Sequence, residues 1–189
     1  MTADLQAPLV RHRFSVADYQ KMIDTGVLSE EDHVELLNGE IVEMSPIKSP
    51  HAAIVKRLNR LLQKYFGNRY LVSIQDPIII RPNSQPQPDI AVLKYRDDYY
   101  YNEHPRPEDI ILLIEVADSS LEKDRKIKLP LYAAAGIQEA WLVDIASKLL
   151  EVHTKPTPQG YSQVQIFRAG DVLQSPSVDS LAVDDILRS

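Results

Sequence analysis

Two carboxylates in this 189-residue chain stand where a metal ion could use them. Asp89 follows Pro88 and begins an apolar run after the polar segment RPNSQPQP, and Glu115 interrupts the apolar run IILLIEV near its end. A carboxylate inside an apolar strand is costly unless a partner or a metal compensates it. If the two runs are neighbouring strands, both carboxylates can reach one point, and such oxygen donors suit Mg²⁺ or Mn²⁺.

Spacing alone is equally compatible with a structural role for the two carboxylates. Glu115 could pair with a lysine or arginine on a neighbouring element, and Asp89 could cap a turn. The two interpretations differ in geometry, because only a metal site requires the carboxylates to converge.

A second pair of acidic residues lies in the segment HVELLNGEIVEM. Asn38-Gly39 between two short apolar runs predicts a β-hairpin with a two-residue turn. Pairing across this turn makes Glu35 and Glu40 diagonal neighbours on one face. Either could supply a third carboxylate or orient a metal-bound water. Two ordinary glutamates on a solvent-facing hairpin explain the same pattern.

The apolar pattern predicts a mixed α/β sheet with helices packed against it. Helices are expected at 16–26, 50–66 and 119–135, and strands at 70–80, 89–94, 110–116, 140–145 and 149–154, followed by one further strand and a short terminal segment. The run at 110–116 is apolar almost throughout, so it is expected to be central and covered on both faces. Pro77 marks 70–80 as an edge or bulged strand. We expect residues 1–13 to form an arm and 14–189 a single domain.

Composition excludes several classes of function. The net charge of -6 counts against a large nonspecific nucleic-acid surface, although an acidic site loaded with metal remains compatible with phosphodiester chemistry. The absence of cysteine excludes disulfides and cysteine-based zinc sites, and the five histidines form no ligand pairs at helical spacing. The sequence has no apolar run of about 20 residues and no signal-peptide pattern, so no membrane association and a cytoplasmic location are expected.

Several stretches occur together in an order and spacing that are informative. They are ELLNGEIV at 35–42, SPH at 49–51, PDIAV at 88–92, IEVADSS at 114–120, DRKIKLPLY at 124–132 and GIQEAWLVD at 136–144. In this arrangement the chain resembles the Uma family of putative restriction endonucleases, which is assigned to the PD-(D/E)XK nuclease superfamily. The resemblance covers roughly residues 14 to 185.

The resemblance implies a restriction-endonuclease-like core, in which a mixed central sheet is flanked by helices, with an N-terminal helix and β-hairpin as an extension. It implies a Mg²⁺- or Mn²⁺-dependent endonuclease acting on nucleic acid, with DNA as the expected substrate. The metal would be held by Asp89, Glu115 and the carbonyl of Val116. Further residues would complete the site: Glu40 and Lys128 in catalytic roles, and Glu35, His51 and Asp124 in supporting ones.

The lysine departs from the usual superfamily pattern, which places it two residues after the glutamate, where this chain has Ala117. The Uma pattern instead offers Lys128 on the following helix, where it shares a face with Asp124. Pro130 cannot donate to the carbonyl of Lys126, so the helix is expected to kink or restart near Lys128.

Without the resemblance, Lys128 is an ordinary solvated lysine. With it, we predict that the ammonium group enters the cleft of Asp89 and Glu115, while Lys126 faces outward. Two features favour a second hypothesis, a catalytically inactive nuclease-fold module that binds a partner. They are the alanine at position 117, where the superfamily usually has lysine, and the negative net charge of the chain.

Other residues admit both functional and ordinary interpretations. His51, in the first turn of its helix, could contact a phosphate together with the free amides there, although a surface histidine is the default. The tyrosines at 99–101 could line a substrate groove, form an exposed loop or provide a homodimer contact, and we predict a homodimer. Trp141 is expected in the core.

Overall fold

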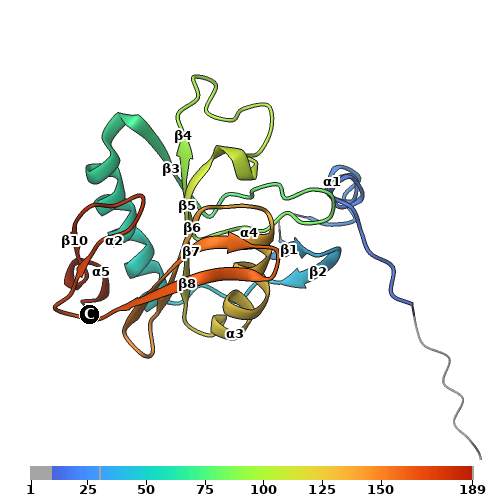
Figure 1. Cartoon of the computed structure of the whole chain (residues 1–189). Helices are drawn as coiled ribbons and strands as arrows, with labels where there is room; N and C mark the ends of the chain where they lie inside the picture. The colour runs from blue at the N-terminus through green and yellow to red at the C-terminus, as the bar shows by residue number, and fades with distance from the viewer. Residues whose placement is uncertain (1–9, 30, 189) are drawn as a thin grey trace, which may run out of the picture.

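The protein is described here by a computed structural model that covers residues 10–29 and 31–188. Its centre is a six-stranded sheet of order β3-β4-β5-β6-β7-β8 (Figure 1). The strands are β3 (Tyr70–Ile74), β4 (Ile90–Lys94), β5 (Ile110–Ala117), β6 (Glu139–Asp144), β7 (Leu149–Thr157) and β8 (Gly160–Phe167). Strands β5 and β6 are parallel and the other neighbouring pairs antiparallel, which confirms the mixed sheet.

Helices cover both faces of this sheet. The long helix α2 (Ser49–Phe66) lies on one face with the short helix α5 (Asp184–Leu187), and α4 (Leu129–Ala134) lies on the other (Figure 1). Ile54, Leu58 and Leu62 recur at helical spacing on α2 and are buried against the sheet, because this apolar stripe removes surface from water. Trp141 lies in the same core and is fully buried, as expected.

Strand β5 is central, as its apolar sequence predicted. Ile114 and Val116 face the α2 side, and Leu113 faces the α4 side. All three are fully buried. Glu115 lies near the end of this strand, two residues before Ala117, and is itself buried.

Two elements differ from the sequence-based expectation. The strand expected at 70–80 ends at Ile74, because Pro77 has no N–H for a ladder and Gln75 has a positive φ of 55°. The single helix expected at 119–135 is instead three pieces: α3 (Leu121–Lys123), a π-helical turn (Asp124–Lys128) and α4. Pro130 withholds one α-helical hydrogen bond from Lys126, which accounts for the interruption.

The N-terminal extension consists of α1 (Val16–Asp24) and the hairpin β1 (Val34–Leu37)–β2 (Glu40–Glu43). Asn38 and Gly39 both have positive φ, 50° and 79°, as a type I′ turn requires. The backbone N–H of Gln85 donates to the carbonyl of Leu36, so the hairpin is tied to the loop that leads into β4.

The C-terminal elements pack against the core on the α2 side of the sheet. After β8 the chain forms the small ladder β9 (Val172–Leu173)–β10 (Leu181–Ala182) and then α5, which agrees with the short terminal segment expected there. Within residues 10–29 and 31–188, no helix is long and apolar enough to cross a membrane.

Candidate active site

Antiparallel pairing of β4 and β5 brings the two carboxylates together. Ile90 lies opposite Ile114, so the next residues outward, Asp89 and Glu115, come to the same end of adjacent strands. The backbone N–H of Val116 donates to Oδ2 of Asp89 at 2.8 Å. Both carboxylates line one pocket of about 540 Å³.

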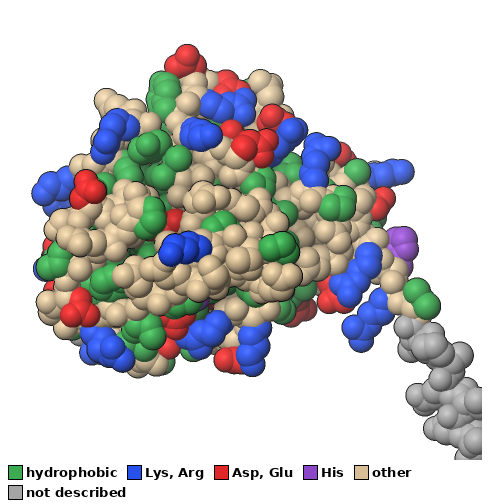
Figure 2. Space-filling model, viewed as in Figure 1, with side chains coloured by type: hydrophobic (Ala, Val, Ile, Leu, Met, Phe, Trp, Pro, Cys, Tyr) green, Lys and Arg blue, Asp and Glu red, His purple; other side chains and the backbone are tan. Residues whose placement is uncertain are grey.

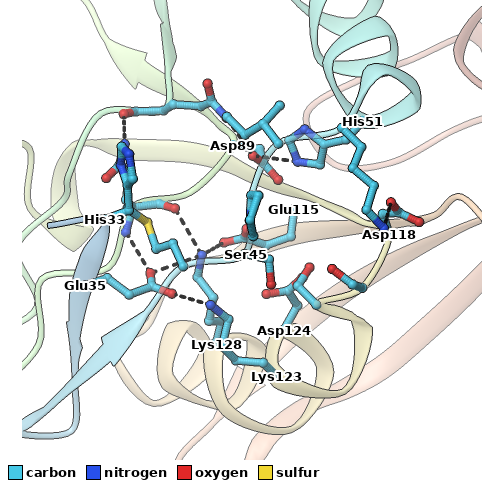
Figure 3. Close-up of a pocket in the computed structure, with 18 residues that line it drawn as sticks. His33, Glu35, Ser45, His51, Asp89, Glu115, Asp118, Lys123, Asp124 and Lys128 are labelled. Atoms are coloured by element: carbon cyan, nitrogen blue, oxygen red, sulfur yellow. Dashed lines mark hydrogen bonds and ion pairs between the residues drawn. The ribbon is translucent and has the colours of Figure 1, made fainter. Parts of the chain in front are cut away.

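Charged side chains of both signs gather in this pocket (Figure 3). The acidic ones are Glu35, Asp89, Glu115, Asp118 and Asp124. The basic ones are His33, Lys48, His51, Lys123 and Lys128. They come from the hairpin, the sheet, α2 and the α3 region, so the pocket exists only in the folded chain.

Glu115 is a deeply buried carboxylate and is 2% exposed. Its Oε1 atom accepts a hydrogen bond from the hydroxyl of Tyr132 and lies 2.8 Å from Nζ of Lys128. Burial raises the pKa of Glu115 to about 8 against the opposing effect of Lys128, and the nearby charges of Asp124 and Asp89 add to the rise. A cation placed beside this carboxyl group would favour its charged form.

Lys128 enters the pocket as a buried ammonium group, and the interpretation as a solvated lysine is wrong. Its side chain is 4% exposed, and Nζ lies 3.4 Å from Oε2 of Glu35 and donates to the carbonyl of Gln87 at 3.1 Å. Burial by itself lowers the pKa of Lys128, but Glu115 and Glu35 outweigh it and hold that pKa above its ordinary value. Lys126, 71% exposed, faces outward and pairs with Glu122.

The π-helical turn accounts for the direction of Lys128. The N–H of Leu129 reaches the carbonyl of Asp124, five residues back. Asp124 is also buried, and it accepts a hydrogen bond from the hydroxyl of Ser120 at 2.6 Å. Burial raises the pKa of Asp124 despite the opposing charge of Lys128. Turns of this kind occur often at functional sites.

Glu35 is the hairpin's contribution to the pocket and is 1% exposed. It lies 2.9 Å from Nζ of Lys123 and accepts a hydrogen bond from the N–H of Gln87 at 3.1 Å. Burial by itself raises the pKa of Glu35, but Lys128 and Lys123 outweigh it and hold that pKa below its usual range. Glu35 is therefore a fixed negative charge behind Lys128.

Glu40 lies elsewhere, although the hairpin register is the expected one. Its carboxylate lies 3.0 Å from Arg13 and 3.8 Å from Arg11, and it is not among the described residues that line the pocket. The N-terminal segment runs beside the turn, where Phe14 donates to the carbonyl of Gly39, so its arginines reach Glu40 first.

His51 joins the site through Asp89, and its default assignment as a surface histidine is wrong. Its side chain is 12% exposed, and Nε2 lies 3.0 Å from Oδ1 of Asp89. The hydrogen bond to Asp89 raises the pKa of His51. Burial by itself raises the pKa of Asp89, but His51 outweighs it and keeps that pKa below its usual value.

The donors fit a divalent cation as a pair. Within residues 10–29 and 31–188, no group of three or more acidic or histidine side chains is arranged as a complete metal site. Mg²⁺ is usually bound through one or two carboxylates, with waters and substrate phosphates supplying the rest. Asp89 and Glu115 offer two such carboxylates.

Sequence reasoning missed Lys123, Tyr132 and the backbone of Gln87. Lys123 and Lys128 are five residues apart, which an ordinary α-helix would spread around its axis, so only the π-helical turn signals their proximity. Tyr132 lies within the stretch DRKIKLPLY, where it looks like a core residue of an amphipathic helix.

Comparisons with known proteins agree with this architecture. The chain matches the sequence model of the family described as Uma2, putative restriction endonuclease, over residues 16–184. It is similar to the crystal structure of a putative nuclease belonging to DUF820 from Anabaena variabilis ATCC 29413, with a TM-score of 0.75 and 16% identity over 92% of this chain and 97% of that one. No curated protein matches the chain. The chain thus belongs to the Uma2 family of putative restriction endonucleases and has a nuclease-like fold.

Proposed function

We propose that this protein is a Mg²⁺- or Mn²⁺-dependent endonuclease that hydrolyses phosphodiester bonds of nucleic acid at the pocket of Asp89, Glu115 and Lys128. The family and the fold support a nuclease. The observation that carries the finer proposal is the buried ammonium group of Lys128, 2.8 Å from Glu115 and beside a facing pair of carboxylates.

Asp89, Glu115 and the carbonyl of Val116 would hold the cation. When bound, such an ion polarises a phosphate oxygen and lowers the pKa of a coordinated water. Lys128 stabilises the negative charge that develops on the attacked phosphate, because its ammonium group is already positioned and desolvated. The hydrogen bond from Tyr132 fixes the orientation of Glu115.

The supporting residues hold these groups in place. Glu35, itself fixed by Lys123, keeps Lys128 charged and directed into the pocket. His51 orients Asp89 through Nε2, and its buried Nδ1 atom has no hydrogen-bond partner among the described residues. In this proposal, His51 and the first-turn amides of α2 would contact a phosphate of the substrate. Asp124, held by Ser120, adds negative charge that favours a cation.

Further parts of the proposal concern the substrate, assembly and organisation. DNA is the proposed substrate, and residues 14–189 form one domain after an N-terminal arm whose first nine residues lie outside the described part. A homodimer is proposed because Tyr99 and Tyr101 are 66% and 89% exposed and offer aromatic contact area. A cytoplasmic location is also part of the proposal. Light scattering that reports a monomer at micromolar concentration would contradict the dimer.

A catalytically inactive binding module is the second candidate. It is favoured by Ala117 at the usual lysine position and by the ion pairs that already engage both carboxylates, with His51 on Asp89 and Lys128 on Glu115. In such a module Lys128 would replace the metal instead of assisting it. Binding of Mn²⁺ therefore separates the two candidates.

Cleavage of matched DNA and RNA tests the proposal. End-labelled strands of one sequence are incubated with the full chain and Mn²⁺, Mg²⁺ or a chelator. We expect cleavage of DNA that needs the metal and is lost in Glu115→Gln. Efficient cleavage in the presence of the chelator, or by Glu115→Gln, would contradict the proposal.

A further inference from the structure

Helix α2 carries a row of three exposed cations on the side away from the sheet. Lys56, Arg60 and Lys64 follow one another at four-residue spacing, so their side chains lie on one side of the helix. Ile54, Leu58 and Leu62 occupy the opposite side and are buried. At about 1.5 Å of rise per residue, the row is about 12 Å long.

The charge of this row is not balanced locally. Helix α2 contains no aspartate or glutamate in its 18 residues, although the whole chain has a net charge of -6. In the part of the chain that the structure describes, none of the three forms an ion pair. On the face shown in Figure 2, basic and acidic side chains are interspersed. On α2 itself, no acidic side chain interrupts the row.

The row also lies on the helix that enters the candidate active site. His51, in the first turn of α2, contacts Asp89, and Lys48, just before the helix, lines the pocket and lies 3.3 Å from Asp118 at its rim. A polymer leaving the pocket past Lys48 would meet Lys56 and then the rest of the row. The row thus lies on the same helix as His51, which contacts the candidate active site.

We propose that Lys56, Arg60 and Lys64 form a phosphate track that binds the backbone of the substrate strand outside the cleavage pocket. This inference rests on the proposed function. The row's length of about 12 Å corresponds to three or four phosphates of a strand, at about 3.4 Å of axial rise each. Contacts of this kind position a nucleic acid without reading its sequence. The track offers an acidic protein a way to hold a polyanion, because it places three exposed cations in a row on one helix.

A matched pair of triple variants tests the track. The track variant is Lys56→Gln, Arg60→Gln and Lys64→Gln, and the control is Lys21→Gln, Lys148→Gln and Lys155→Gln, which removes the same charge at exposed sites elsewhere. Glutamine retains good helix propensity, and thermal unfolding checks that both variants fold. Fluorescence anisotropy measures the binding of a labelled single-stranded oligonucleotide in chelator at several salt concentrations.

We expect the track variant to bind at least about tenfold more weakly and to lower the slope of log K against log salt by about 2, because three phosphate contacts contribute about 0.7 each for a single strand. The control should retain both the affinity and the slope of the wild type. Equal weakening in the two variants, or in neither, would overturn the track. So would loss of binding to phosphatidylserine vesicles, with oligonucleotide binding unchanged, in the track variant alone.

A small substrate separates the track from the active site. Bis(p-nitrophenyl) phosphate has one diester and no strand to reach α2, so the track variant should hydrolyse it at the wild-type rate while its KM for an oligonucleotide rises. If the wild type hydrolyses neither substrate but binding still depends on the row, the proposed function fails and the track stands. If the ester is hydrolysed and oligonucleotide KM is unchanged in the track variant, only the track fails.

Discussion

Nζ of Lys128 lies 2.8 Å from Oε1 of Glu115, and the two side chains are 4% and 3% exposed. One comes from a π-helical turn and the other from the central strand, so the contact exists only because the α3 region crosses the end of β5. Breaking a buried ion pair by removing one partner costs several kcal/mol. The pair lies beside a second carboxylate, Asp89, in the same pocket.

The first prediction concerns metal binding and pH. The pKa of Glu115 is raised to about 8, above the ordinary 4.5 of an unfolded chain. In the metal-free protein its contribution to the free energy of unfolding is therefore fully present below about 4.5 and is lost as the pH rises through about 8. Mn²⁺ needs the carboxylate form, so the increase in Tm that it causes should grow from about pH 6 to about pH 8.5.

Scanning fluorimetry with and without Mn²⁺ across this pH range measures the effect. Glu115→Gln is the control, since it removes the titrating group and keeps the side-chain shape. The interpretation fails if the variant shows the same Mn²⁺-dependent increase in Tm and the same growth with pH.

The second prediction concerns the hairpin that carries Glu35. A Cβ atom at Gly39 would lie 2.8 Å from Cβ of Arg13, and Gly39 has a φ of 79°. Gly39→Ala should therefore lower the free energy of unfolding by about 1–3 kcal/mol and displace Glu35 from the pocket. Gly26→Ala isolates the backbone strain, because Gly26 has a φ of 73° but no neighbouring atom within 4 Å. Urea unfolding of equal cost in both variants would exclude the steric contribution.

The third prediction concerns Lys123, which lies 2.9 Å from Glu35. Lys123→Gln removes the charge that helps hold Glu35 beside Lys128, so kcat for bis(p-nitrophenyl) phosphate should fall by about tenfold. KM should change little, because Lys123 acts on Lys128 and not on this small substrate.

Lys126→Gln serves as the control for Lys123→Gln, since that side chain is 71% exposed. Lys123→Arg should restore most of the activity. A change confined to KM, or no recovery with arginine, would mean that Lys123 does not act through Glu35.

Much of this architecture could be predicted from local sequence. The Asn38-Gly39 turn fixed the hairpin register, because few residues other than asparagine and glycine accept its positive φ values. The continuous apolar run at 110–116 indicated the central strand, since strands covered on both faces typically have such sequences. Asp89 and Glu115, at the ends of their apolar runs, were therefore expected to meet.

The remaining features depend on tertiary contacts that spacing does not encode. Glu35 and Glu40 share a hairpin face, but Arg13 holds one outside while Lys123 holds the other inside. His51 is buried because α2 begins over the end of β4, and no local signal fixes that placement. The strand predicted at 70–80 is shorter than expected. It ends before Gln75, where the backbone turns although apolar residues follow.

The central claim is that Lys128 assists catalysis at the carboxylate pair, and the rate of Mn²⁺-dependent DNA cleavage by Lys128→Met and Lys126→Met tests it most directly. Both variants remove one lysine from the same region, and urea unfolding and Mn²⁺ binding are measured in parallel to confirm that each is folded. The account predicts a loss of about 100-fold or more for Lys128→Met and a near wild-type rate for Lys126→Met. A folded, Mn²⁺-binding Lys128→Met variant that cleaves at the wild-type rate, or a loss confined to Lys126→Met, would contradict it.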